Sequence, residues 1–582
     1  MNSLVLVVIG FTTFFLGYRF YSKYISFNLF EINKSISTPS QNMQDGIDYY
    51  PTKKHILFGH HFTSIAGAAP IIGPCVAAYW GWLPAILWIL FGTVFMGAVH
   101  DLGALVASVK EQGRSIADIA SSVISKRVRF MFLIFVLMLV WLVLAVFAMA
   151  IADLFVSVPT SVIPVNIQII IALIMGVLLN KKKMNSLLLS LGSVALLYFF
   201  VWIGSNNPML LSDSASSTEL KNYWIVLLFI YSAIASLLPV WVLLQPRDYI
   251  NSHQLFIGLI LLFLGVIVAQ PNVSAPAIRS FSDPNTPGLF PLLFVTIACG
   301  AISGFHGLVA SGTTSKQLEN LSDARMIGYG GMLGEGTLAL ISTIAAVAGI
   351  SLVGHATLPS NGYIADLDWS QYYATWEHAS GNKAAAFVLG GGALLKSLGI
   401  PESFANTLMA VFVISFAATT LDTATRIQRF ILGEFGKAAN VKLLINKYIA
   451  TLIAIIPALF LAFWNVQDPT SGASRQVGWV LWPIFGASNQ MLAALTLMVL
   501  TLYFWKKRKF ILPLLIPMAI LMVVTFSALL ANAISFYGNN NILFILTLML
   551  IVLIVWMLFE GLSKMMRTNS NMLGNNFYVK KK

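Results

Sequence analysis

Apolar stretches long enough to cross a lipid bilayer recur along this chain, from Leu4 to Leu562. A helix needs about 20 mostly apolar residues to span a hydrocarbon core about 30 Å thick. Charged residues make up only 10% of the chain, whereas about 25% is usual in soluble domains. No long polar segment separates the apolar stretches. The sequence therefore predicts an all-α polytopic membrane protein with short loops and no separate soluble domain.

Hydropathy predicts about fifteen crossings, each with a length close to that of a bilayer-spanning helix. They are expected at 3–24, 57–81, 84–109, 129–157, 164–180, 184–204, 223–244, 253–270, 291–314, 326–353, 402–424, 443–464, 478–504, 510–533 and 541–562. The first is predicted to be a retained span, because it has neither the basic start nor the small-residue cleavage site of a signal peptide.

The glycine-rich stretch 384–398 is too short for a full crossing, and we expect it to be re-entrant or interfacial. We divide the chain into an N-terminal region, 1–380, and a C-terminal helical region, 381–582, that completes the bundle. Both regions are expected to lie in the lipid of the cell's inner (cytoplasmic) membrane.

The basic residues indicate how the chain is oriented. With the N-terminus outside and the crossings alternating, 30 of the 35 Lys and Arg residues fall on the inner side, as the positive-inside rule requires. The other five are Lys221, Arg279, Lys383, Lys396 and Arg475. The C-terminus is then cytoplasmic, and the net charge of +13 reflects topology rather than binding to nucleic acid.

Several kinds of chemistry have no motif in this sequence. Cys75 and Cys299 both fall within apolar stretches, so neither a disulfide framework nor a zinc motif is indicated. The sequence contains no Walker A segment for ATP and no His-Glu-x-x-His zinc-protease signature. The glycines of 328–336 lie in a predicted crossing and are expected to permit close packing. We therefore predict no cofactor, no metal and no enzymatic activity.

Two predicted crossings contain a similar segment at which the helix can readily unwind. Residues 62–70 read Phe-Thr-Ser-Ile-Ala-Gly-Ala-Ala-Pro, and residues 231–239 read Tyr-Ser-Ala-Ile-Ala-Ser-Leu-Leu-Pro. Proline removes a backbone donor, and the small residues before it make unwinding easy. Because the segments are five crossings apart, they run in opposite directions, as in inverted repeats with discontinuous helices around a substrate. The alternative is that small residues and proline simply allow helices to pack closely.

An unwound helix exposes amides and carbonyls that can bind a carboxylate or a cation. The polar and small residues of the two segments, with the histidines just before the first, are the predicted substrate site. These residues are His60, His61, Thr63, Ser64, Gly67, Ser232 and Ser236. Since His60 and His61 are adjacent, they point about 100° apart on a helix and cannot both face one ligand. One is expected at the cavity, where it pairs with an anion or takes a proton.

Several of these segments carry a resemblance to a known family. The motifs are Gly59–Gly67 with Pro70–Pro74, His100-Asp101 with Gly113-Arg114-Ser115, Leu238–Trp241 with Gln245–Tyr249, Ser311–Lys316, and Thr420–Arg426. Together they resemble the signature of the carbon starvation (CstA) family, from about residue 3 to beyond 480. The resemblance implies a multi-pass transporter related in fold to the amino acid–polyamine–organocation superfamily, with a LeuT-like five-plus-five inverted repeat and extra helices. It also implies a substrate that is either a peptide or a small carboxylate such as pyruvate, imported during nutrient limitation.

Ionisable groups inside a crossing are costly and are functional hypotheses by default. Glu335 lies about ten residues into its crossing between two glycines, and His306 lies deep in a glycine-rich one. Asp422 lies near the inner end of its crossing, one turn before Arg426. We predict that Glu335, Asp422 and His306 couple transport to protons. The alternatives are a structural hydrogen bond for Glu335, packing for His306, and an interfacial ion pair of Asp422 with Arg426.

Ser311, Thr313 and Thr314 offer hydroxyls of the kind that a hard cation such as sodium prefers. In the superfamily's fold, the corresponding helix supplies hydroxyls to a sodium site. Membrane serines and threonines usually bond back to their own helix, so proton coupling is preferred. A membrane enzyme using His60 and His61, a nutrient sensor and a channel are the rival functions. The sequence leaves open the choice between peptide and pyruvate, and the oligomeric state.

Overall fold

The computed structural model describes residues 1–32, 36–45, 48–182, 184–212, 214–280, 287–358, 362–381, 384–467, 474–476 and 480–579. Lys383 and the first residues of the predicted crossing 478–504 lie outside these ranges. The described part is helical apart from two short antiparallel hairpins, which are β1 (His355–Leu358) with β2 (Gly362–Ala365) and β3 (Asn465–Gln467) with β4 (Ser474–Gln476).

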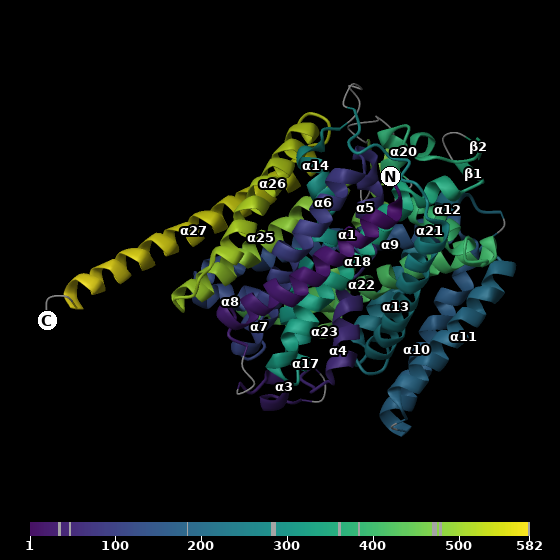
Figure 1. Ribbon diagram of the computed structural model, residues 1–582. Helices are drawn as coiled ribbons and strands as arrows, with labels where there is room; N and C mark the ends of the chain where they lie inside the picture. The colour runs from purple at the N-terminus through teal and green to yellow at the C-terminus, as the bar shows by residue number, and fades with distance from the viewer. Residues whose placement is uncertain are drawn as a thin grey trace.

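Figure 1 shows the helices coloured in chain order, from purple at the N-terminus to yellow at the C-terminus. The first half contains α1 (Ser3–Leu16), α2 (Ser22–Asn28), α3 (Pro39–Asn42), α4 (Lys54–Ile65), α5 (Ala69–Ala77), α6 (Trp82–Gly92), α7 (Ala98–Lys110), α8 (Ile116–Val123), α9 (Lys126–Ser157), α10 (Val162–Lys182), α11 (Ser186–Asn206), α12 (Ser217–Leu237) and α13 (Leu244–Ala269). The second half contains α14 (Leu289–Thr296), α15 (Ala298–Ala301), α16 (Gly304–Val309), α17 (Ser315–Gln317), α18 (Gly330–Val347), α19 (Trp369–Tyr372), α20 (Trp376–Gly381), α21 (Ala385–Lys396), α22 (Glu402–Ala438), α23 (Lys447–Phe463), α25 (Trp482–Lys506), α26 (Leu512–Phe536) and α27 (Asn541–Val579).

Twelve helical segments of the described chain are long and apolar enough to cross a membrane, and the bent pair α4–α5 makes a thirteenth. The all-α membrane architecture is thus as predicted, whereas the count of fifteen is not reproduced. The predicted crossing 291–314 is divided into short helices, and α23 is 17 residues long. The stretch 384–398 forms the 12-residue helix α21, and whether it is re-entrant stays a prediction.

The predicted break in the second crossing is present. Helix α4 ends at Ile65, α5 begins at Ala69, and the two axes differ by 46°. Ala66 has a non-helical backbone, and Pro70 lies in the first turn of α5. Proline is well tolerated there, because its missing N–H has no helical partner in a first turn. The small residues and Pro70 therefore end one helix and start another within the same crossing.

The predicted break at 231–239 is wrong. Helix α12 is continuous from Ser217 to Leu237, and the chain turns only after it, before α13 begins. Pro239 therefore lies beyond the last helical turn, where it interrupts no hydrogen bond of the helix. The second interrupted crossing lies instead at α14–α16, with a non-helical Ile297 and extended backbone at Ile302 and Ser303.

The interrupted helices run in opposite directions and touch each other. Figure 1 places α4 and α17 at one end of the bundle and α5 and α14 at the other. Helix α5 packs on α14 and α15, and α4 packs on α16. The long helices α9 and α22 pack on one another, and each contacts both α12 and α23. In the same way α13 packs on α4, and α25 packs on α16.

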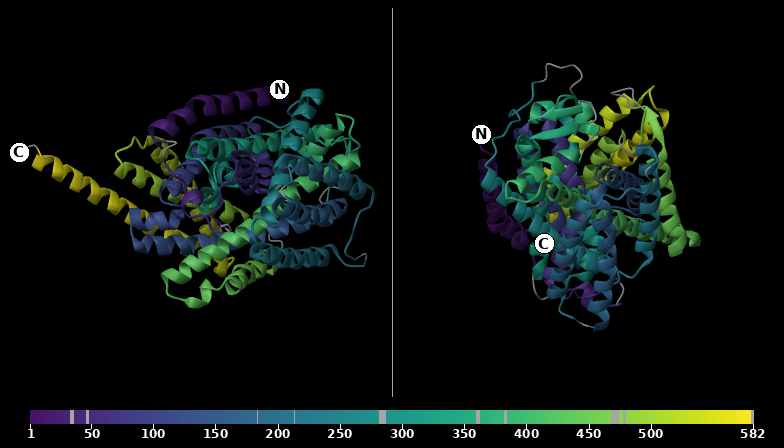
Figure 2. Two further views of the ribbon diagram at one scale, coloured as in Figure 1. Left: turned by 90° about the horizontal axis from the view of Figure 1, so that it is seen from below. Right: turned by 90° about the vertical axis from the view of Figure 1, so that its right-hand side faces the viewer.

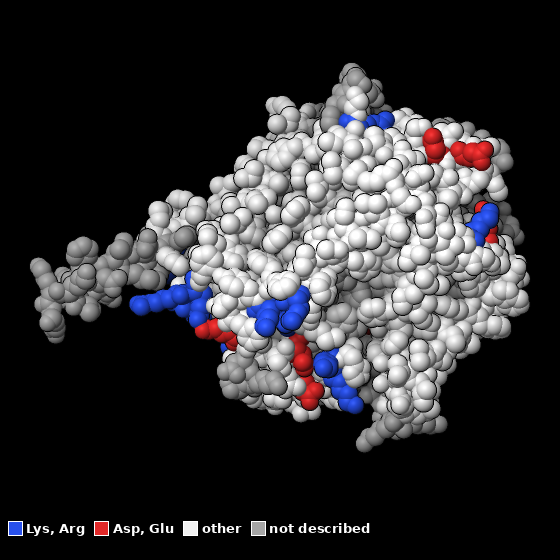
Figure 3. Space-filling view, in the orientation of Figure 1, with Lys and Arg blue, Asp and Glu red and all other residues white. Residues whose placement is uncertain are grey.

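The remaining elements lie around this core. The α10–α11 hairpin lies at one edge, and the views of Figure 2 show α27 extending beyond the rest of the bundle. The face in Figure 3 is largely uncharged across its middle, with charged side chains mainly along the lower margin. Large apolar side chains are exposed on these outer helices, as on Leu188 and Phe559. Such a belt suits contact with lipid tails.

Close approach between α18 and α21 depends on one glycine. A Cβ on Gly390 would lie 2.1 Å from the carbonyl oxygen of Ala345, and a backbone atom cannot move aside easily. We expect Gly390→Ala to lower the free energy of unfolding by about 1–3 kcal/mol through overpacking. Gly433→Ala is the matched control, since nothing lies within 4 Å of its Cβ position and alanine favours a helix. Thermal unfolding in detergent would measure both, and equal stability of the two variants would contradict the packing argument.

Candidate functional site

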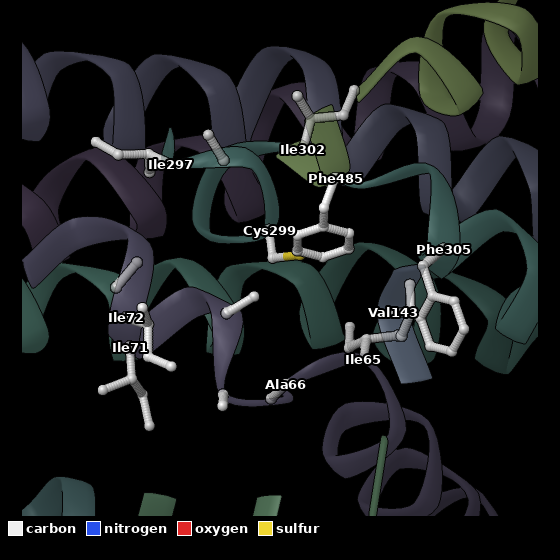
Figure 4. Close-up of a cluster of buried hydrophobic side chains, with 14 of the residues drawn as sticks. Ile65, Ala66, Ile71, Ile72, Val143, Ile297, Cys299, Ile302, Phe305 and Phe485 are labelled. Atoms are coloured by element: carbon white, nitrogen blue, oxygen red, sulfur yellow. The ribbon is translucent and has the colours of Figure 1, made fainter. Parts of the chain in front are cut away.

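The two interruptions meet in the apolar interior of the protein. Figure 4 shows the side chains of Cys299 and Phe485 between Ile65 and Ala66 on one side and Ile297 and Ile302 on the other. All of these residues are buried. Two discontinuous helices thus place irregular backbone side by side in the core, which is the arrangement that membrane transporters use near a substrate.

Gly67 brings the first interruption against the two long helices. A Cβ at this position would lie 2.3 Å from Oγ1 of Thr420 on α22 and 3.5 Å from the ring of Phe147 on α9. The backbone can approach this closely only because glycine has no side chain. Gly67, one of the predicted substrate residues, therefore lies at the contact between the broken crossing and the α9–α22 pair.

Asn489 of α25 holds the second interruption in place. Its Oδ1 accepts the backbone N–H of Phe305 at 3.0 Å, and its Nδ2 donates to Ser303 Oγ at 2.9 Å. The same Nδ2 lies 3.2 Å from the sulfur of Cys299. The side chain thus caps the first turn of α16 and satisfies groups that the broken helix leaves without partners.

We expect Asn489→Ala to destabilise the protein by about 1–3 kcal/mol, because the Phe305 amide would be buried without an acceptor. Transport should fall together with stability, because the backbone of the second interruption would lose its fixed geometry. Asn532→Ala is the control: Asn532 is also a buried asparagine of a crossing, and its Nδ2 has no hydrogen-bond partner. Thermal unfolding and uptake would be measured together, and equal effects of both substitutions would exclude the capping role.

A chain of four ionisable side chains lies beside the second interruption. His100 Nδ1 is 2.7 Å from Asp101 Oδ1 on α7, and Asp101 Oδ2 is 3.0 Å from His306 Nδ1 on α16. His306 Nε2 is 3.2 Å from Glu335 Oε2 on α18. All four residues are fully buried. His306 therefore lies between two carboxylates that come from different helices.

His61 lies close to this chain. Its Nδ1 hydrogen-bonds with Thr314 Oγ1 at 2.9 Å, and its Nε2 is buried with no hydrogen-bond partner among the described residues. A Cβ at Gly331 of α18 would lie 3.0 Å from the imidazole ring. His61 thus faces the same three-helix region as His306, as the adjacent-histidine argument allowed for one of the pair.

His60 belongs to a second network on the other side of α4. Its Nδ1 is 2.8 Å from Asp248 Oδ2 on α13, and Arg247 donates to Asp248 Oδ1 at 3.0 Å. Arg247 also pairs with Asp422 of α22 and donates to the hydroxyl of Tyr231 at 2.8 Å. Of the two adjacent histidines, His60 therefore contacts a buried charge network directly, whereas His61 bonds to the hydroxyl of Thr314.

The expected interfacial pair of Asp422 with Arg426 is wrong. Asp422 is fully buried, pairs with Arg247, and accepts a hydrogen bond from the Tyr231 hydroxyl at 3.0 Å. Arg426 donates to the carbonyl of Leu238 at the end of α12. The physical reason is that the last carbonyls of a helix lack partners and attract a guanidinium, while the carboxylate faces inward toward α13.

Most predicted hydroxyl ligands bond to their own helix. Ser311 donates to the Gly307 carbonyl and Thr313 to the Val309 carbonyl. The same pattern of donation to an earlier carbonyl holds for Thr63, Ser232 and Ser236. Ser64 Oγ is buried with no partner. Within the described residues, no group of three or more His, Cys, Asp or Glu is placed to hold a metal ion.

A cavity of about 340 Å³ opens beside Lys316 of α17, at the same end of the bundle as α4 (Figure 1). It contains both signs of charge, from Arg114, Asp118, Lys316 and Glu434. A pocket of about 20 Å³ shares Gly312, Lys316 and Phe430 with it and reaches His60. Tyr49, in the loop before α4, also lines the larger cavity, and burial raises the pKa of its hydroxyl above the ordinary value. The phenol therefore stays neutral.

At the other end of the broken crossing, an arginine packs among aromatic rings. The guanidinium of Arg279 lies 4.1 Å from the centre of the Tyr79 ring and 5.5 Å from that of Trp369. It also donates to the Tyr373 carbonyl at 2.7 Å, and the Tyr373 hydroxyl donates to the Cys75 carbonyl at 2.6 Å. These contacts tie the α5 end of the broken crossing to Trp369 and Tyr373, whereas the cavity and the pocket beside it lie toward its α4 end.

Comparison with known proteins decides the family. Residues 2–528 match the family described as carbon starvation protein CstA. The chain belongs to this family. Peptide transporter CstA of Escherichia coli (strain K12) is 32% identical over 574 residues, which cover 91% of this chain and 81% of that protein. Pyruvate/proton symporter BtsT of the same organism is 31% identical over 570 residues, covering 88% and 78%.

The crystal structure of a mutant manganese transporter from Eremococcus coleocola is also similar. It is 15% identical, with a TM-score of 0.46, and the match covers 93% of this chain and 98% of that one.

Within this CstA-family chain, sequence reasoning missed several members of the two networks. Asp101, Arg247 and Asp248 were noted only as parts of family motifs, and Asn489 was not noted at all. The available signal was polarity inside an apolar crossing, since Ser488-Asn489-Gln490 interrupts the predicted crossing 478–504. Such groups are costly in a membrane unless they have partners, and therefore mark sites.

Proposed function

We propose that this protein is a secondary active transporter that imports peptides or a small carboxylate such as pyruvate, coupled to protons, by alternating access. The names of its CstA-family relatives, one a peptide transporter and one a pyruvate/proton symporter, support both substrate classes. The single observation that carries the proposal is the buried chain Asp101–His306–Glu335 beside the second interrupted helix.

Proton coupling follows from the chemistry of this chain. Histidine changes its charge near neutral pH, and His306 lies between the carboxylates of Asp101 and Glu335. Gain or loss of one proton changes the charge that holds α7, α16 and α18 together, so it can bias how these helices pack. Histidine nitrogens are poor ligands for hard cations, which prefer oxygen. A sodium ion at Ser311, Thr313 and Thr314 is the second candidate, and the donation of Ser311 and Thr313 to their own helix weighs against it.

Alternating access is supported by the two ends of the broken helices. One end has a cavity of about 340 Å³, and at the other end Arg279 packs against the rings of Tyr79 and Trp369. We infer that the arrangement is open to the cytoplasm, with the N-terminus outside and the C-terminus inside the cell membrane. The matching contacts of α4–α5, α6–α7, α9, α12, α13 and of α14–α16, α18, α22, α23, α25 support a five-plus-five inverted repeat.

Purified protein in sealed proteoliposomes tests the proposal. Labelled pyruvate and a labelled dipeptide would be offered in turn under an inward proton gradient, a sodium gradient or no gradient. Accumulation under the proton gradient alone is the expected result. Chemical change of the substrate by detergent-solubilised protein would favour the enzyme alternative, and flux independent of every gradient would favour a channel.

A further inference from the structure

His60 lies outside the Asp101–His306–Glu335 chain and has a hydrogen-bonding arrangement of its own. Its Nδ1 is bonded to Asp248 Oδ2 at 2.8 Å, while its Nε2 is buried with no hydrogen-bond partner in the described part of the chain. The side chain lines the pocket that joins the inner cavity at Lys316. The imidazole therefore has one nitrogen fixed to a carboxylate and one free to accept a proton from the cavity side.

Asp248 is held in the orientation that stabilises a protonated His60. Its second oxygen accepts from Arg247, and Arg247 is itself fixed by Asp422 and by the Tyr231 hydroxyl. The carboxylate cannot turn away without breaking this network. A carboxylate bonded to the far nitrogen of an imidazole stabilises the imidazolium form.

Other charged groups face His60 from every side, and their effects partly cancel. Lys316 and Arg426 line the same pocket and disfavour a positive imidazole, whereas Asp48 in the pocket favours it. Asp248 makes the direct contact, while Arg247 and Asp422 lie one step beyond it. On the opposite side of α4, the region of His61 holds His306, Glu335 and Asp101. Among the charged side chains that the structure describes, Asp248 is the only one within hydrogen-bond distance of the His60 imidazole.

We propose that His60 and Asp248 form a second proton-binding site, separate from the Asp101–His306–Glu335 site. A proton adds to the Nε2 lone pair of His60, and Asp248 carries the balancing negative charge. The two sites share no residue and no helix, since one is built from α7, α16 and α18 and the other from α4 and α13. Each transport cycle then carries two protons with one substrate. This inference rests on the proton coupling that is proposed above.

The number of coupled protons can be measured directly. The measurement uses proteoliposomes with the membrane potential clamped at zero and a pH difference of one unit. This difference balances a substrate gradient of about tenfold if one proton is carried with each substrate, and of about hundredfold if two are carried. The reason is that each coupled proton adds the same free energy. We expect about hundredfold for the wild type and about tenfold for His60→Gln. Glutamine keeps a donor for Asp248 but cannot accept the second proton. His253→Gln is the control, since His253 bonds to Ser190 and to the Tyr249 carbonyl, outside both networks.

A value of about tenfold in the wild type would overturn the second site, and so would a hundredfold value in His60→Gln. If His60→Gln does not purify as a single species, Asp248→Asn makes the same test, and the wild-type value decides the question on its own. Failure of the proposed function is distinguishable, because the wild-type balance would then not depend on the pH difference at all.

Discussion

Glu335→Gln is expected to slow proton-driven uptake strongly and to lower accumulation at a difference of one pH unit from about hundredfold to about tenfold, while leaving exchange of substrate across the membrane largely intact. The substitution keeps the shape of the side chain and removes its ability to bind and release a proton. Glu335 is fully buried, its Oε2 lies 3.2 Å from His306 Nε2, and no other ionisable side chain is paired with it among the described residues. Proton-driven uptake should fall by about 100-fold or more, in line with the loss of a proton-transfer group elsewhere.

Uptake and exchange would be measured in the same proteoliposomes, with and without an imposed proton gradient. Glu402→Gln is the matched control, because Glu402 pairs with Lys396 at the exposed start of α22. Exposed pairs of this kind contribute little. If Glu335→Gln protein kept the wild-type rate of uptake and the wild-type accumulation, the Asp101–His306–Glu335 chain would not be a coupling site.

The membrane architecture could be predicted from sequence because it depends on local composition. Each crossing must satisfy its own backbone hydrogen bonds, so an apolar stretch of sufficient length becomes a helix wherever it packs. The break before Pro70 was predictable for the same reason, since the proline and the small residues that cause it are neighbours in the chain.

The second interruption could not be located in this way. Pro239 suggested a break in α12 but lies after the last turn, whereas the real interruption at Ile302 and Ser303 has no proline beside it. It is stabilised by Asn489, which is almost 190 residues away in sequence. A cap supplied by a distant helix leaves no pattern in the segment that it caps.

The buried networks show the same limit. Glu335 and His306 could be singled out individually, because each is an ionisable residue in an apolar crossing. The third member, Asp101, contacts His306 from α7, which precedes α16 by about 200 residues. For Asp422, the neighbour in sequence was Arg426, but the partner in space is Arg247. Pairing between helices is decided by packing, which the sequence of one helix does not encode.

Arg247→Met should be the most destabilising substitution in the second network. Arg247 is 2% exposed and bonds to Asp248, Asp422 and Tyr231. Removing one partner of a buried ion pair leaves an uncompensated charge and costs about 3–5 kcal/mol. Methionine has a similar length, so the loss would come from charge rather than from a cavity. Unfolding in detergent, followed by heat or denaturant, would measure it.

The double variant Arg247→Met, Asp422→Asn separates charge from packing. It removes one positive and one negative group together, so the net buried charge returns to its wild-type value, and a large part of the lost stability should return. Lys396→Met is the control for loss of an exposed pair and should change stability by less than about 1 kcal/mol. If the double variant were as unstable as Arg247→Met alone, shape rather than charge would explain the defect. Recovery would instead show that Asp422 requires Arg247 as its counter-ion. Because Arg247 then neutralises Asp422, the second buried carboxylate, Asp248, remains available to His60.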